Sequence, residues 1–242
     1  PLSEIGKAFE EEDCPLAASS YFGLAAAMKA MNPVAFRNPL SRQAAVLVRV
    51  NLFEAAERCL MDGITILEQG IPQWDAAKVR DARITIDIFQ YLRSDVALKR
   101  GDKEAAATLR DQALENLLDH AKPDIGDLCE PFLFLREVWA DLGEQELALR
   151  ACDQLFVALQ TAKATQPGLA AEMLAAVAEQ VMADKRLPRA KMFADEAMSF
   201  AEKTHPRSDV RARALLVLAI VRRDSNDFDG ADAAFKSLRD HY

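Results

Sequence analysis

A turn followed five residues later by an alanine recurs along the chain, and it constrains the fold more than any other feature. Four clear copies begin at Gly101, Gly143, Lys185 and Asn226, and their spacings are 42, 42 and 41 residues. The alanines that follow are Ala106, Ala148, Ala190 and Ala231. A fixed period of this length is typical of repeat architectures, in which one supersecondary unit is copied along the chain.

Two weaker copies extend the series towards the N-terminus. Asp13 leads to Ala18 and Asn51 leads to Ala56, with looser spacings of 38 and 50 residues. One proline follows each of the first five alanines at a distance of 15 to 19 residues; these are Pro33, Pro72, Pro123, Pro167 and Pro206. Proline cannot continue a helix and is common just past its end, so we expect it to close each repeat.

Each repeat is predicted to be a pair of helices. The apolar residues after Ala148 and Ala190 recur at i, i+3, i+4, i+7 and i+8, the spacing of one helical face. Only 9 of the 242 residues are glycine, which also favours helices. The helices are expected over 2–12 and 15–31, 40–50 and 52–69, 74–100 and 103–120, 126–142 and 145–164, 168–184 and 188–203, and 207–225 and 228–240.

Two segments leave alternatives open. Residues 40–69 could form one long helix instead of a hairpin. The stretch Ile84–Ile88 alternates like a strand, but it lies in a long segment without Gly or Pro and also fits a helical stripe, so we favour a helix. Trp139 has helical spacing to Leu135 and is predicted to pack in the core. Trp74 could pack as a staple onto the preceding hairpin or form an exposed contact.

Charge and composition exclude some functions. The net charge is −8, and residues 102–183 hold 15 acidic against 6 basic side chains, so we expect no nucleic-acid partner. No apolar run reaches the roughly 18 residues that a membrane span needs. Cys14, Cys59, Cys129 and Cys152 lack C-x-x-C spacing and are expected to be reduced, buried thiols in a cytoplasmic protein.

Motifs that carry chemistry are scarce. The three histidines, His120, His205 and His241, lie at expected helix ends, and Glu202 with His205 gives only one E-x-x-H copy. Glycine-rich phosphate loops and nucleophile elbows are missing from the sequence. Glu130 with Glu137, and Glu172 with Glu179, lie seven residues apart and share helix faces; a solvated acidic face, a ligand-facing surface and a metal site all remain open. We expect no catalytic residue, no metal and no cofactor.

The repeat resembles the tetratricopeptide repeat. The resemblance rests on the turn residues Gly101, Gly143 and Asn226, on the four alanines above, and on small residues twelve positions before those alanines, such as Ser94, Ala178 and Ala219. It implies an all-α, right-handed superhelix, or α-solenoid, of about six antiparallel helix hairpins. We expect one domain over 1–242, with hairpins near 1–33, 40–71, 74–121, 124–165, 167–205 and 207–242. The period exceeds the 34 residues of the family, which implies elongated helices.

The resemblance also implies a binding surface. In tetratricopeptide-like arrays the first helix of each hairpin lines the concave face. Transferring those positions to this chain selects Tyr91, Asp95, Lys99, Glu130, Glu137, Asp141, Glu172, Glu179, Arg213 and Arg223. We therefore predict a non-catalytic scaffold or adaptor that binds a protein or peptide, with a basic segment facing the acidic centre. The alternative is a ligand- or peptide-sensing regulatory domain of a larger signalling or transcription-regulatory protein.

Overall fold

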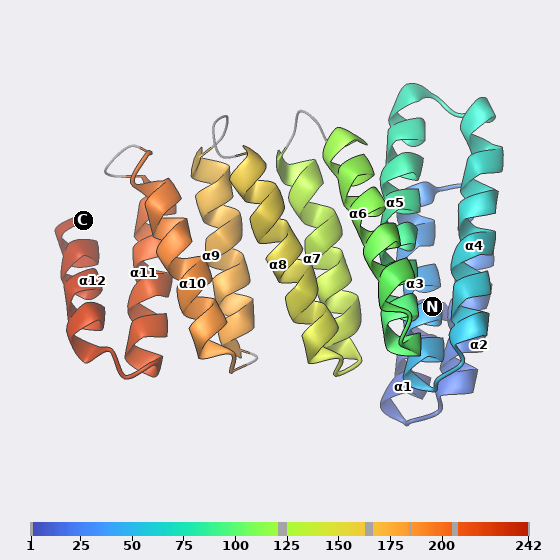
Figure 1. Cartoon of the computed structure of the whole chain (residues 1–242), viewed down its shortest axis with the longest axis horizontal. Coiled ribbons are helices and arrows are strands. Elements are labelled where there is room, and N and C mark those ends of the chain that lie inside the picture. Colours follow the sequence, from blue (N-terminus) through green and yellow to red (C-terminus); the bar gives the residue numbers. More distant parts are fainter. Residues whose placement is uncertain (1, 121–124, 163–166, 184, 205–207, 242) are drawn as a thin grey trace. The chain divides into compact units, whose positions relative to one another are not determined.

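The computed structural model describes residues 2–120, 125–162, 167–183, 185–204 and 208–241, and every regular element in these ranges is helical (Figure 1). The α-helices and the single 3-10 turn of the described ranges are α1 (Leu2–Glu11), α2 (Pro15–Ala27), α3 (Pro33–Arg49), α4 (Phe53–Gly70), η1 (Ile71–Gln73), α5 (Ala76–Arg100), α6 (Lys103–His120), α7 (Ile125–Asp141), α8 (Gln145–Ala162), α9 (Pro167–Ala183), α10 (Leu187–Ala201), α11 (Asp209–Asp224) and α12 (Phe228–His241). The prediction of an all-α fold is confirmed.

Each hairpin reverses direction at a residue in the left-handed backbone conformation. Among the described residues with positive φ are all six residues at which the sequence repeats begin: Asp13, Asn51, Gly101, Gly143, Lys185 and Asn226. Glycine, asparagine and aspartate tolerate this conformation best, which explains their use at five of the six turns. The repeat found in the sequence is therefore the hairpin turn itself.

The alanine that follows each turn lies at a close helix–helix contact. Ala18, Ala56 and Ala190 are fully buried, and the other three alanines of the series are at most 3% exposed. A larger side chain would push the paired helices apart. Two of the turns also supply the helix cap, since Asp102 accepts a hydrogen bond from the Ala105 amide and Asp227 accepts one from the Gly230 amide.

The chain divides into two compact units. Unit 1 comprises Pro1–Lys122 with Glu137–Ala148, and unit 2 comprises Pro123–Arg136 with Leu149–Tyr242. In each unit helices pack on their neighbours in the chain, and first helices of successive hairpins also meet, α3 against α5 and α9 against α11. Within each unit this is the stacking of an α-solenoid. The right-handed superhelix and the single domain over 1–242 stay predictions.

The described prolines of this series lie between hairpins as expected, but two of them begin the next helix. Pro33 and Pro167 are the first residues of α3 and α9, and Pro72 lies in the 3-10 turn. Pro123 and Pro206 lie outside the described residues. Proline fits the first turn of a helix because the amide it lacks has no partner there, so Pro33 and Pro167 open the next hairpin, whereas Pro72 lies just past the end of α4 as expected.

The second hairpin differs most from expectation. Its first helix, α3, begins at Pro33 instead of residue 40, and it runs through Pro39. Asn32 caps it by accepting a hydrogen bond from the Ala35 amide. The alternative of one helix over 40–69 is wrong, since the chain turns at Asn51, whereas Ile84–Ile88 is helical as favoured.

Both tryptophans pack inside unit 1. Trp139 is 1% exposed, which confirms its predicted place in the core. Trp74 is half-buried, and its ring lies so close to Gly70 that a Cβ there would come within 2.3 Å of it. Trp74 is therefore the staple onto the end of α4.

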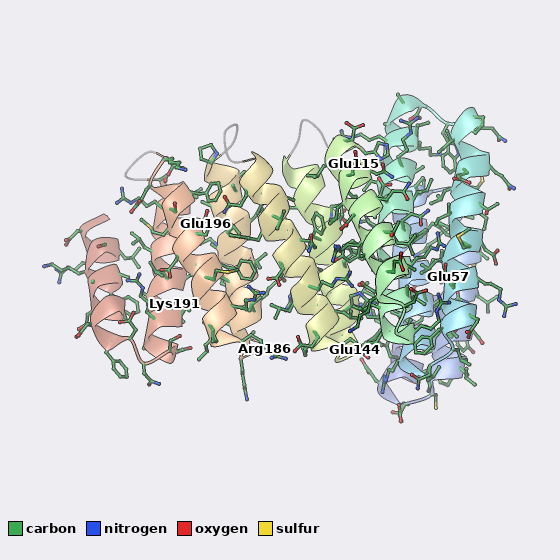
Figure 2. All side chains as sticks on the ribbon, in the orientation of Figure 1. Glu57, Glu115, Glu144, Arg186, Lys191 and Glu196 are labelled. Carbon is green, nitrogen blue, oxygen red and sulfur yellow. The ribbon has the colours of Figure 1, made fainter. Side chains whose placement is uncertain are left out.

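Charged side chains join successive hairpins within each unit. In unit 1 the Arg93 guanidinium on α5 lies 2.6 Å from the Glu57 carboxylate on α4. In unit 2 Arg189 on α10 lies 2.7 Å from Asp153 on α8. Figure 2 labels Glu57 on the side of α4 toward α5. These contacts complement the apolar packing between hairpins.

Candidate functional site

Two of the predicted site residues lie in the interior. Tyr91 and Asp95 on α5 are both 0% exposed, which corrects the expectation that they face a partner. The Trp139 indole nitrogen donates a hydrogen bond of 2.8 Å to Asp95, so this carboxylate joins α5 to α7 inside unit 1. Their distance from the turn at Gly101 predicted that both residues lie on the partner-binding face of α5. The next hairpin packs against α5 at this point and covers them.

An arginine clamp in unit 1 gathers two other predicted residues. Arg42 on α3 pairs with Asp141 and lies 3.7 Å from Glu137, both on the last turns of α7. It also lies 3.9 Å from Glu10 on α1, and its own side chain is only 3% exposed. Glu137 and Asp141 are partly exposed, so these two carboxylates reach the surface while the cation between them stays buried.

Burial shifts the pKa of one carboxylate in this cluster. The pKa of Glu10 is raised mainly because burial disfavours its charged form, and Asp141 adds to the rise. Arg42 and Arg49 act in the opposite direction. A buried arginine needs such carboxylates, since an unpaired buried charge is strongly destabilising. We call Arg42 with Glu10, Glu137 and Asp141 the Arg42 clamp.

A second clamp lies in unit 2 and is open to solvent. Arg213 on α11 lies 3.6 Å from Glu172 and 3.1 Å from Glu179, both on α9. All three side chains are about two-fifths exposed, between 40% and 43%. The acidic pair that shares a face of α9 thus flanks one cation from the next first helix. We call these three residues the Arg213 clamp.

The remaining predicted residues do not form a cluster with the clamps. Lys99 at the end of α5 pairs with Glu144, labelled in Figure 2, at 2.5 Å. Arg223 is exposed and pairs with its neighbour Asp224 at 2.8 Å. Glu130 is exposed on α7. The sequence placed these residues correctly on first helices, but the acidic centre that it predicted is partly neutralised by Arg42 and Arg213.

One contact between a histidine and a buried carboxylate was missed by the sequence analysis. The His120 Nδ1 at the end of α6 lies 2.6 Å from the Asp87 carboxylate on α5, whose side chain is 2% exposed. Burial raises the pKa of Asp87 to about 6, and the opposing causes are the hydrogen bond and charge of His120, a hydrogen bond from Asn116 and the charge of Arg83. The visible signal was a single carboxylate among the isoleucines of Ile84–Ile88.

The cysteines do not share one environment. Cys129 and Cys152 are buried as expected, whereas Cys59 is half-buried and Cys14 is exposed in the first hairpin turn. Burial is the main cause that raises the pKa of Cys59 to about 12, with the charge of Asp62 adding to it. The Cys59 thiol therefore stays protonated and is a poor nucleophile.

The described residues offer neither a metal cluster nor a membrane-spanning helix. No cluster of three or more His, Cys, Asp or Glu side chains there could hold a metal ion. None of the helices in the described ranges combines the length and the apolar composition needed to cross a bilayer. His205 lies outside the described residues, as does its E-x-x-H spacing to Glu202.

Comparisons with known proteins give structural likeness only. No protein-family model and no curated protein sequence matches the chain. The crystal structure of BtubC from P. vanneervenii is similar with 15% identity and a TM-score of 0.44, over 95% of this chain and 90% of that one. The S. pombe nuclear import adaptor Nro1 is similar with 14% identity and a TM-score of 0.40, over 98% of this chain and 91% of that one. At these scores function must be argued from the residues of this chain.

Proposed function

We propose that the chain is a tetratricopeptide-like repeat protein of the cytoplasm that acts as a non-catalytic scaffold or adaptor, and that it binds a protein or peptide along its first helices. The observation that carries the proposal is the direct stacking of first helices, α3 on α5 and α9 on α11. Stacked repeats of this kind present extended surfaces that suit an elongated partner.

The Arg213 clamp is the part of this surface best suited to a charged partner. Its two carboxylates and one guanidinium give a net charge of −1, and each side chain is about two-fifths exposed. A lysine or arginine of the partner would complete two ion pairs there. The Arg42 clamp is less suited, because its cation is buried and its carboxylates are already needed to compensate that cation.

Charge reversal at the exposed clamp tests the proposal. We expect Glu172→Lys with Glu179→Lys to reduce partner recovery in a pull-down from the native cell, and to leave the helical circular dichroism unchanged. Wild-type recovery should also fall as ionic strength rises, because exposed charges act mainly on association and are screened by salt.

A matched control separates this effect from net charge. Glu54→Lys with Glu104→Lys makes the same charge change at exposed positions on the second helices α4 and α6. Recovery should then equal that of wild type. If the first-helix and second-helix reversals recover the same amount of partner, the first helices are not the binding surface and the proposal is wrong.

A further inference from the structure

The outer face of α2 is apolar and has no partner within the described part of the chain. Leu16, Leu24 and Met28 are 61%, 56% and 79% exposed, and Met31 and Val34 continue the exposed apolar surface into the start of α3. Among the α-helices that the structure describes, α2 alone contains no Asp, Glu, Lys or Arg. Exposed second helices elsewhere in the chain carry charges on their outer faces, so this surface requires a separate explanation.

The arrangement of this face is self-complementary. Leu16, Ser20, Leu24 and Met28 follow one another at intervals of four residues and form one ridge of the helix. Reversing the ridge about the level of residue 22 exchanges Leu16 with Met28 and Ser20 with Leu24. Two copies that pack antiparallel across a two-fold axis would therefore set each Leu24 into the gap that Ser20 leaves in the opposite ridge.

The absence of charge also fits a two-fold axis. In an isologous interface, residues near the axis meet their own copies, so any charge there would face a like charge. The stretch from Pro15 to Met28 holds none. A partner of different sequence would place no such restriction on the middle of the helix.

The charges that flank α2 favour the antiparallel direction. Exposed Glu11 and Glu12 precede the helix, and exposed Lys29 follows it. Reversal about residue 22 places Lys29 of one copy at the level of residue 15 of the other, the end of α2 that Glu11 and Glu12 precede. Parallel packing would instead bring the two acidic ends together.

From the ridge, the uncharged centre and the opposite flanks we propose that α2 is a homodimer interface, in which two copies of this chain pack antiparallel through Leu16, Ser20, Leu24 and Met28. This interface lies on a second helix and goes beyond the partner binding proposed for the first helices. One helix face is at the small end of specific interfaces, so the dimer should dissociate on dilution.

Sedimentation velocity on the full chain over about two decades of micromolar concentration tests the proposal. The wild-type mass should rise from that of the monomer towards that of the dimer, and Leu24→Glu should stay monomeric. Leu216→Glu is the matched control, because Leu216 is an exposed leucine of α11 in unit 2; it should dimerise like wild type. A monomeric wild type, a species larger than a dimer, or a Leu24→Glu variant that dimerises like wild type would overturn the proposal.

A charge exchange tests the direction of packing. Lys29→Glu should weaken the dimer about tenfold, because it sets three carboxylates together at each end of the interface. Adding Glu12→Lys to it should restore the wild-type dissociation constant, since each chain then offers the reversed pair. A double variant no tighter than Lys29→Glu alone would overturn the antiparallel arrangement. Both substitutions are at exposed positions, and unchanged circular dichroism confirms that the variants fold.

Discussion

The two arginine clamps are built alike, with three carboxylates around Arg42 and two around Arg213, but they lie in opposite environments. In each, one arginine from a first helix lies between carboxylates of another first helix, Arg42 in unit 1 and Arg213 in unit 2. The Arg42 side chain is 3% exposed, whereas that of Arg213 is 40% exposed. Water can replace the carboxylates around Arg213 but cannot reach Arg42, so the same ion pairs are structural in one unit and available for binding in the other.

Removing the buried cation should have the largest effect. We expect Arg42→Met to lower the free energy of unfolding of unit 1 by about 3–5 kcal/mol, because it removes the cation that is paired with the largely buried Glu10. Both tryptophans, Trp74 and Trp139, belong to unit 1, so their fluorescence during urea unfolding reports this unit.

A second substitution locates the cause of that loss. Adding Glu10→Gln to Arg42→Met should recover part of the stability, since the uncompensated carboxylate is then neutral. A loss under about 1 kcal/mol for Arg42→Met would show that Arg42 is as dispensable as a surface cation, and the contrast between the clamps would fail.

Substitutions that disturb helix packing should cost the two units similar unfolding free energy, unlike the substitutions of their arginines. Ala148 lies in unit 1 and Ala190 in unit 2, and both are at most 2% exposed. Leucine at either position should overpack a helix contact and cost about 1–3 kcal/mol, measured by thermal or urea unfolding. Ala233→Leu is the control, because Ala233 is exposed on α12 and the change should be nearly neutral. Equal losses at all three alanines would contradict the assigned hairpin register.

Asp87 extends the comparison to a buried acid in unit 1. Its pKa rises from 3.8 to about 6 on folding, so between these values the folded state binds a proton that the unfolded state has lost. The unfolding free energy should therefore fall as pH rises from about 4 to 6, with a slope approaching about 1 kcal/mol per pH unit. The variant Asp87→Asn should lack this component, as seen by tryptophan fluorescence. Parallel pH profiles for wild type and variant would exclude Asp87 as its source.

The exposed clamp should give the smallest effect. We expect Arg213→Met to change the free energy of unfolding by less than about 1 kcal/mol, with the difference shrinking as salt is added. Circular dichroism would detect it, whereas tryptophan fluorescence should not change. A loss as large as that of Arg42→Met would mean that exposure does not decide the role of these arginines.

The hairpins could be predicted from the sequence because their signals lie within a single repeat. The turns at Gly101, Gly143 and Asn226, and the alanine five residues later, depend on backbone conformation and on the neighbouring helix, both readable within one repeat. The start of α3 was missed: Asn32 caps a helix that begins at Pro33, seven residues before the expected start at residue 40, and the helix continues through Pro39.

The candidate site was less predictable because its residues depend on distant partners. Asp95 is buried against Trp139, 44 residues away, and Arg42 meets Asp141, 99 residues away. Position within a repeat gives the helix face but not what the next hairpin brings to it. The exposed face of α2, in contrast, has a signal in the sequence itself, the absence of charge from Pro15 to Met28.

The six left-handed turns also bear on how the chain folds with time. Each joins two helices that meet within a few residues of the turn, such as the ends of α5 and α6 at Gly101. Closing so short a loop costs little chain entropy, and local contacts of this kind form early in folding. Each hairpin can therefore pair as soon as its second helix leaves the ribosome, before the next repeat has been synthesised.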